Sequence, residues 1–158
     1  MARQRRRATG ASGDAVSTQR FTIDASVFVN AFNPHEVGHA ASLEFLAAVH
    51  RQAVPVIIPS LAAVEIASAV ARAADDTDGA LGYVNAVMAL PYLSVVQLTG
   101  PLSRLAATLA ATHRLRGADA IYAAVARRYG TTLVSRDREQ RARGGEAVDC
   151  RTPETAFR

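Results

Sequence analysis

The sequence has 158 residues, of which 49% are hydrophobic, and a formal net charge of +4, which predicts one domain with its own core. Its single cysteine, Cys150, excludes an internal disulfide and a zinc site built from several thiolates. All 18 basic residues other than histidine are arginines. The absence of lysine excludes Walker-type phosphate loops and Schiff-base enzymes, because both need an ammonium group.

The positive charge is confined to the N-terminal segment. Residues 1–20 hold five arginines against Asp14, and the rest of the chain holds 13 arginines against 13 acids. A segment rich in Arg, Ser, Gly and Thr is typical of a disordered tail, with a nonspecific phosphate-binding arm as the alternative. We therefore expect a tail at residues 1–19 and a domain at residues 20–158.

No apolar stretch in the sequence approaches the roughly 20 residues needed to span a bilayer. The basic "RQRRR" near the start is followed by "ATGASGDAVSTQ" instead of the hydrophobic region of a signal peptide. The sequence therefore predicts a cytoplasmic protein that does not bind a membrane.

Five short runs rich in β-branched residues predict strands. In chain order, these runs span residues 20–24, 54–59, 93–98, 131–135 and 147–150.

Longer stretches between these runs predict helices. Asn33 is a suitable N-cap for the first expected helix, with Pro34 at the first helical position. Ser60 is a suitable N-cap for the second expected helix, and Gly130 is a suitable residue to end the last one. Strands that alternate with helices indicate an α/β fold, with a central parallel sheet of four to five strands and helices on both faces. The expected helices span residues 34–50, 60–74, 78–90, 101–113 and 118–129.

Two aspartates follow expected strands, where open parallel sheets place their chemistry. Asp24 closes the first strand, and Asp137 lies two residues beyond the fourth. Each aspartate also has an interpretation as a helix cap or turn residue. Neither of them identifies a site by itself.

Two further acids lie within expected apolar helices. Glu65, in "LAAVEIASAVA", has no cation three or four residues away. A carboxylate in this setting must pair with a distant arginine such as Arg72, take up a proton or bind a metal. Asp119 opens the helix in "RGADAIYAAVA", where the helix dipole favours an acid and N-terminal capping is the alternative role.

The order of these four acids and the sequences around them resemble the PIN domain. The resemblance runs over residues 21–150 and is carried by "IDASVFVNAF", "IIPSLAAVEIASAV", "LRGADAIYAAVARRYGTTLVSRD" and the short final strand. Within that family, the sequence is most similar to the VapC-type toxins of bacterial toxin–antitoxin pairs, which are small single-domain ribonucleases.

The resemblance implies an endoribonuclease in which a metal-bound water attacks an RNA phosphodiester. It also implies a cognate antitoxin as a partner and assembly as a homodimer. Ser26 and Ser135 match hydroxyl positions that support the acids, and Arg116 is a candidate phosphate contact. Hard divalent ions prefer oxygen ligands, and the residues implied to hold one or two Mg²⁺ or Mn²⁺ ions are Asp24, Glu65, Asp119 and Asp137.

The motif His35-Glu36-x-x-His39 offers a different interpretation, because this pattern on a helix binds zinc in metallopeptidases. The extended form of the motif fails, since Phe45 stands where a third histidine is expected and Ser42 where a glycine is expected. Recruiting Glu65 as the third ligand leaves the three aspartates without a role. Pro34 places the motif in the exposed first turn of its expected helix, so we interpret the match as incidental.

A further alternative is a PIN-like domain that binds RNA or a protein without cutting. Caps and turns account for three of the four acids individually. The presence of all four acids together favours the nuclease, which we expect to depend on Mg²⁺.

Overall fold

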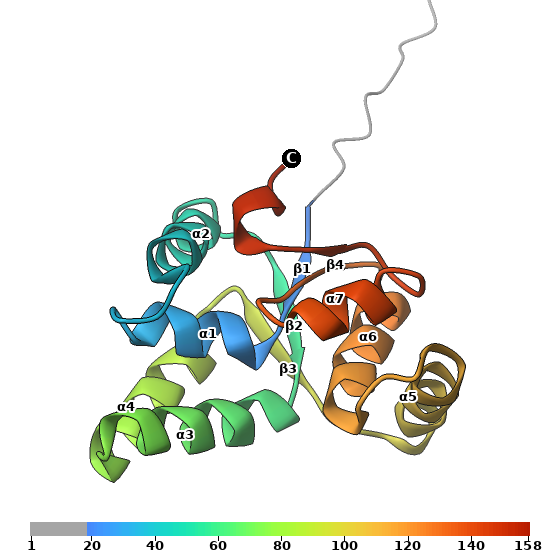
Figure 1. Cartoon of the computed structure of the whole chain (residues 1–158), viewed down its shortest axis with the longest axis horizontal. Helices are drawn as coiled ribbons and strands as arrows, with labels where there is room; N and C mark the ends of the chain where they lie inside the picture. The colour runs from blue at the N-terminus through green and yellow to red at the C-terminus, as the bar shows by residue number, and fades with distance from the viewer. Residues whose placement is uncertain (1–18) are drawn as a thin grey trace, which may run out of the picture.

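The computed structural model describes residues 19–158, and its centre is a five-stranded sheet (Figure 1). All neighbouring strands run parallel, in the order β3-β2-β1-β4-β5. This arrangement confirms the predicted parallel α/β fold. The strands are β1 (Phe21–Ile23), β2 (Val56–Pro59), β3 (Leu93–Val96), β4 (Thr132–Val134) and β5 (Cys150–Arg151).

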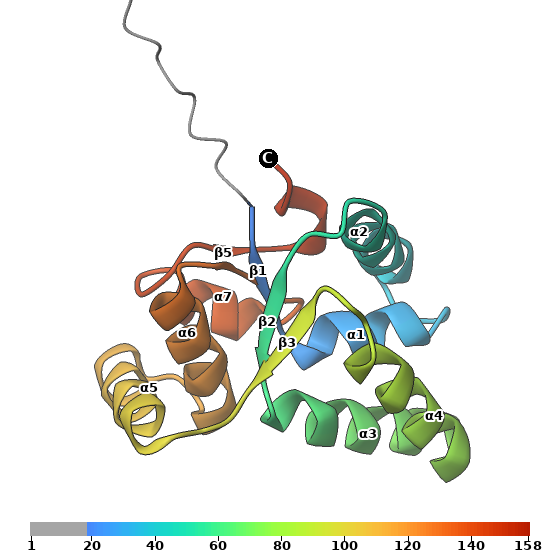
Figure 2. The same ribbon diagram turned by 180° about the vertical axis from the view of Figure 1, so that it is seen from behind.

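Helices cover both faces of the sheet. Figures 1 and 2 show α1 to α4 on one side and α5 to α7 on the other. This division follows from right-handed crossovers, because the chain moves in one direction from β1 to β3 and in the opposite direction from β3 to β5. The helices are α1 (Ala25–Phe32), α2 (His39–Arg51), α3 (Leu61–Ala74), α4 (Thr77–Met88), α5 (Gly100–His113), α6 (Gly117–Tyr129) and α7 (Arg138–Gly144), followed by the 3₁₀ turn η1 (Pro153–Thr155).

The connections reverse direction at β1 and β4, which are neighbours in the sheet. In open parallel sheets, ligands bind at such a switch point, beyond the carboxyl ends of the strands. Asp24 directly follows β1, and Asp137 follows β4. The fold therefore brings together two acids that are more than a hundred residues apart in the sequence.

The core lies between the sheet and its two helical layers. Phe21, Ile23, Ile58 and Leu133 from the strands are at most 1% exposed. Helix α6 contacts β1, β2 and β4, and its buried face consists largely of alanines, which allow the helix axis to approach the sheet closely. Within residues 19–158, no helix combines the length and hydrophobicity that crossing a membrane requires.

The segment between α1 and α2 differs from the prediction. Helix α2 begins at His39, not at residue 34, and residues 34–38 form turns. Helix α1 was not among the predicted helices. Asn33 is its C-cap and not the N-cap of the next helix, because the N–H of Asn33 donates to the carbonyl of Val29. The N-cap of α2 is Gly38, whose φ of 86° lies in the left-handed region that glycine adopts without strain.

Several strand boundaries also depart from the prediction, since β2 begins at Val56 instead of residue 54 and β3 ends at Val96 instead of residue 98. Residues 147 and 148 do not belong to β5, because their N–H groups donate to the carbonyl of Gly144 and close the turn after α7, a helix that was not predicted. Ser60 precedes α3 as expected, but its side chain makes no capping hydrogen bond. Gly130 ends α6 in the left-handed conformation, with φ of 61°, as predicted.

The expected tail, residues 1–19, lies outside the part of the chain that the structure describes, with the exception of Gln19. The side-chain amide of Gln19 donates a hydrogen bond to the carbonyl of Ala156 at 2.8 Å.

Candidate active site

A pocket of about 470 Å³ lies at the switch point of the sheet. All four acids singled out in the sequence line it, and they come from four different elements: the ends of β1 and β4, the middle of α3 and the first turn of α6. Its remaining lining is largely apolar or small. These other residues are Ala25, Ser26, Val29, Val64, Ser68, Ala69, Arg72, Arg116 and Ala118.

Asp24 is the most deeply buried of the four acids, with 8% exposure. It is the N-cap of α1, where its Oδ2 accepts a hydrogen bond from the N–H of Ser26 at 3.0 Å. The hydroxyl of Ser135 donates to the same oxygen at 3.4 Å, and Nε2 of Gln140 donates to Oδ1 at 3.5 Å. Burial nevertheless raises the pKa of Asp24 above its ordinary value, because desolvation outweighs these donors.

Asp137 is the N-cap of α7 and accepts from the N–H of Gln140 at 2.9 Å. Its other oxygen contacts Nη2 of Arg116 at 2.6 Å. Partial burial acts to raise the pKa of Asp137, but the backbone amide and the guanidinium together lower it. The cap interpretation of Asp24 and Asp137 is therefore correct, and the same two residues line the pocket.

Glu65 has a neutral partner. The buried hydroxyl of Tyr122, on α6, donates to its Oε2 at 2.7 Å. Arg72, the partner considered from the sequence, donates to Ser68 instead. Burial raises the pKa of Glu65, and the neighbouring Asp24 and Asp119 raise it further.

Asp119 lies in the first turn of α6, whose N-cap residue is Arg116. Capping therefore does not explain Asp119. Its carboxylate accepts a hydrogen bond from Nε of Arg116 at 3.1 Å. Burial raises the pKa of Asp119 although this guanidinium acts to lower it, and Asp137 and Asp24 add to the increase.

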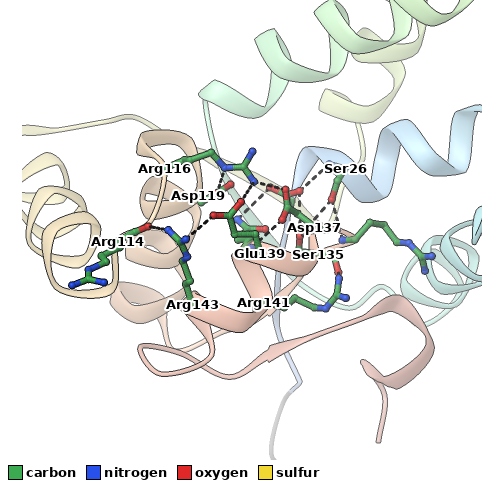
Figure 3. A network of polar contacts seen from close by, with 12 residues as sticks. Ser26, Arg114, Arg116, Asp119, Ser135, Asp137, Glu139, Arg141 and Arg143 are labelled. Carbon is green, nitrogen blue, oxygen red and sulfur yellow. Dashed lines mark hydrogen bonds and ion pairs between the residues drawn. The ribbon is translucent and has the colours of Figure 1, made fainter.

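Arg116 joins two of the acids, as Figure 3 shows. Its guanidinium contacts Asp119 and Asp137, and its Nη2 also lies 3.6 Å from Glu139. These anions raise the pKa of Arg116, with Asp119 the largest cause. The side chain is 59% exposed, so it is free to leave the carboxylates without unpacking the core.

Both serines contact the acids, but only Ser135 does so through its hydroxyl, as the resemblance implies. Ser135 connects Asp24 and Asp137: its hydroxyl donates to Asp24 and accepts from the N–H of Asp137 at 3.0 Å. Ser26 supports Asp24 through its backbone N–H, while its hydroxyl accepts from the N–H of Arg136 at 3.0 Å. Both serines hold the ends of β1 and β4 in fixed relative positions.

Sequence reasoning missed Tyr122 and Gln140. Each lies three residues after a candidate acid, Asp119 and Asp137 respectively, which places it on the same helical face as that acid. Both are fully buried polar residues. Helical spacing from a candidate acid could have indicated that they share its helical face, but not that their side chains contact Glu65 and Asp24.

The residues of the His35-Glu36-x-x-His39 motif do not form a zinc-binding helical face. His35 lies in the turns before α2, and His39 is the first residue of that helix. Glu36 accepts from the side-chain amide of Asn30 at 3.0 Å, and Nδ1 of His39 lies 3.1 Å from the carbonyl of Asn30. These contacts fix the loop between α1 and α2, and none of the motif residues lines the acidic pocket.

Replacing His35 and His39 together by alanine is therefore expected to leave the RNA cleavage predicted from the sequence within about an order of magnitude of that of the unsubstituted protein, because neither imidazole lies in the pocket. A small loss of thermal stability is expected from the lost contact between His39 and Asn30. Cleavage assays and zinc analysis by mass spectrometry check this result. Loss of activity together with loss of a stoichiometric zinc would restore the peptidase interpretation.

The donors in the pocket fit a hard divalent cation, because they are carboxylate oxygens that repel one another at close range. They do not form a closed cage: across residues 19–158, no three acidic, histidine or cysteine side chains meet closely enough to hold one ion. Mg²⁺ commonly binds through one or two carboxylates and keeps several waters, so it does not need three protein ligands. The guanidinium of Arg116 indicates that positive charge is favoured at this position.

Comparisons with solved structures identify the same fold. VapC20 of Mycobacterium tuberculosis, a toxin that cleaves the sarcin–ricin loop, superposes with a TM-score of 0.68 at 18% identity, covering 83% of this chain and 98% of that chain. PAE2754 from Pyrobaculum aerophilum gives a TM-score of 0.64 at 22% identity, covering 90% of each chain. FitAcB from Neisseria gonorrhoeae gives 0.61 at 17% identity, covering 85% and 99%.

Sequence comparison then identifies the family. No curated protein sequence matches the chain significantly. The sequence model of the PIN domain matches residues 21–146, which include all four acids of the pocket. Together with the five-stranded parallel sheet, this match establishes that the chain belongs to the PIN domain family.

Proposed function

We propose that the protein is a Mg²⁺-dependent endoribonuclease and the toxin of a toxin–antitoxin pair. One observation carries the proposal: carboxylates from four separate elements line a single pocket at the switch point of a PIN domain. Helix capping explains Asp24 and Asp137 individually. It does not explain Glu65 and Asp119, whose pKa values are raised by burial and by the neighbouring acids. Mn²⁺ is expected to replace Mg²⁺, since both ions prefer oxygen ligands.

Asp24 and Asp137 are the acids best suited to hold the ion, because caps, serines and Gln140 fix both of them. Glu65 and Asp119 face the same pocket from the helices. When bound, the ion supplies a water of lowered pKa and neutralises charge on the phosphoryl oxygens. Val29 and Val64 form an apolar part of the pocket lining.

Arg116 has two roles in the proposal. While it contacts Asp119 and Asp137, its positive charge competes with a divalent ion for the same oxygens. When an ion takes its place, the exposed side chain becomes free to contact an RNA phosphate. A guanidinium suits this role because its parallel N–H groups match the geometry of phosphate oxygens.

Arg116→Met is expected to tighten Mg²⁺ binding by about two- to fivefold, because a competing surface cation is removed. The same change is expected to weaken RNA binding and to lower cleavage even at saturating Mg²⁺. Calorimetry and a cleavage assay measure the two effects. Arg114→Met is the matched control, since Arg114 is an exposed arginine two residues away that makes no ion pair within residues 19–158. Unchanged metal affinity in Arg116→Met would contradict the competition.

The toxin part of the proposal is supported by the fold shared with VapC20 and by similarity to two toxin–antitoxin complexes, one from Klebsiella pneumoniae and one, VapBC2, from Rickettsia felis. We propose a small antitoxin, encoded next to this gene, that inserts an arginine among the carboxylates. The contacts of Arg116 support this mode, because they place a guanidinium against two of the same acids. A homodimer remains part of the prediction.

Induced expression in a bacterial host tests the proposal. Wild-type protein should slow growth and create new RNA 5′ ends at a small set of positions, and Asp119→Asn should do neither at equal protein level. Equal growth arrest by both proteins, without new RNA ends, would contradict the nuclease function. Co-expression of the adjacent small reading frame should restore growth if it encodes the antitoxin.

A further inference from the structure

Gln140 contacts two of the four acids at once. It is fully buried on α7, at 0% exposure. Its side-chain Nε2 donates to Oδ1 of Asp24 at 3.5 Å, and its backbone N–H donates to Oδ1 of Asp137 at 2.9 Å. A single residue therefore links the carboxylate that follows β1 to the carboxylate that follows β4.

The other end of the Gln140 side chain has no partner. Its Oε1 is buried and, within the part of the chain that the structure describes, accepts no hydrogen bond. A buried carbonyl oxygen without a donor costs free energy of folding. Exchanging the amide oxygen and nitrogen would not remove this cost, because the oxygen would then face the carboxylate of Asp24.

Packing alone does not explain an amide at this position. Methionine has a similar length and would fill the same space beneath α7 without burying an unsatisfied oxygen. Leucine is likewise apolar and a good helix former. Compared with these apolar side chains, the amide buries an unsatisfied oxygen, and its contribution in return is a hydrogen bond to the buried carboxylate of Asp24.

We infer that Gln140 is a positioning residue of the metal site, which holds Asp24 by its side-chain amide and Asp137 by its backbone so that both carboxylates face one divalent ion. This inference rests on the proposed function. Gln140 does not contact the ion or the substrate itself. It acts through the acids that it orients, as partners of metal ligands commonly do.

The test compares Gln140→Met and Gln140→Leu with the wild-type full-length protein. Both variants are expected to melt at the same temperature as wild type or higher when metal-free, because the unsatisfied oxygen is gone. Their affinity for Mn²⁺, measured by calorimetry, is expected to fall by about tenfold or more. Opposite directions for stability and metal affinity are the signature of a positioning residue.

Ser42→Ala is the matched control. Ser42 is fully buried on α2, and its hydroxyl donates to Oδ1 of Asn30 at 2.7 Å, outside the acidic pocket. Removing this hydroxyl is expected to lower the melting temperature and to leave Mn²⁺ affinity unchanged. The control separates the loss of any buried hydrogen bond from the loss of one that orients a ligand.

Three results would overturn the inference. The first is unchanged Mn²⁺ affinity in both Gln140 variants. The second is a lower melting temperature of the Gln140 variants, together with a loss of Mn²⁺ affinity no larger than that of Ser42→Ala. The third is failure of both variants to fold, because the amide would then be required for structure. Failure of the proposed function is recognised separately, because in that case the wild-type protein itself binds no Mn²⁺.

Discussion

Replacing Asp119 with asparagine is expected to reduce RNA cleavage by at least roughly a hundredfold, because the change removes one of the carboxylates proposed to hold the ion. The metal-free protein is expected to melt at the same temperature or slightly higher. Burial raises the pKa of Asp119, and Asp137 and Asp24 raise it further, so the folded protein disfavours this charge. Asparagine has the same size and carries no charge.

Asp78→Asn is the matched control for this variant. Asp78 also lies in the first turn of its helix, α4, but it is exposed and does not line the pocket. Its replacement is expected to leave cleavage and Mg²⁺ binding unchanged. Melting curves with and without Mg²⁺, recorded beside the cleavage assay, distinguish the two sites. An Asp119→Asn protein that is clearly destabilised yet cuts RNA at the wild-type rate would make Asp119 a structural residue.

Glu65→Gln is expected to have an effect of similar size, with cleavage lower by about a hundredfold. The glutamine oxygen would still accept a hydrogen bond from the hydroxyl of Tyr122, which now donates to Glu65 at 2.7 Å. The packing of α3 against α6 should therefore persist. Since burial raises the pKa of Glu65, removal of its charge should leave the metal-free melting temperature unchanged or higher.

The second measurement on Glu65→Gln is the increase in melting temperature that Mg²⁺ produces. Wild-type protein should gain stability as Mg²⁺ is added, because the ion binds only the folded state. The gain should be much smaller in Glu65→Gln and intact in Glu44→Gln, a control in which an exposed acid of α2 is replaced. An undiminished gain in Glu65→Gln would exclude Glu65 from the metal site.

The sequence was sufficient to predict the parallel sheet and the four acids that line the pocket. Strands such as β2 are short apolar runs that end at Pro59 as predicted, and Asp24 and Asp137 stand just beyond the ends of strands. The acids of the helices were recognisable because their neighbours are apolar, which makes a carboxylate conspicuous. These signals are local, so a single sequence contains them.

Contacts between distant residues were not predictable in the same way. Tyr122 is 57 positions from Glu65, and Gln140 is 116 positions from Asp24. Their roles depend on how α6 and α7 pack against the sheet. The burial of Gln140 was also not predictable from its neighbours, because a glutamine among the charged residues of "RDREQRAR" is expected to be exposed to solvent.

The His-Glu-x-x-His pattern illustrates the same limit. Its spacing is correct for a zinc-binding helix, but that interpretation requires a helix that includes both histidines. Asn30, which is 5% exposed, donates to Glu36 and to the carbonyl of Val37 and so stabilises a loop instead. The buried side-chain amide of Asn30, on α1, stabilises this loop through both contacts. No local sequence signal indicated that Asn30 would be buried.

We propose that this PIN domain cuts RNA with a divalent ion held by its acidic pocket. The most direct test incubates the purified protein with a structured RNA in Mg²⁺, in a chelator, and in the chelator followed by excess Mg²⁺. We expect internal cleavage in Mg²⁺, none in the chelator and recovery when Mg²⁺ is restored. RNA that is bound but left intact in Mg²⁺, or cut equally in the chelator, would show that the protein is not a metal-dependent ribonuclease.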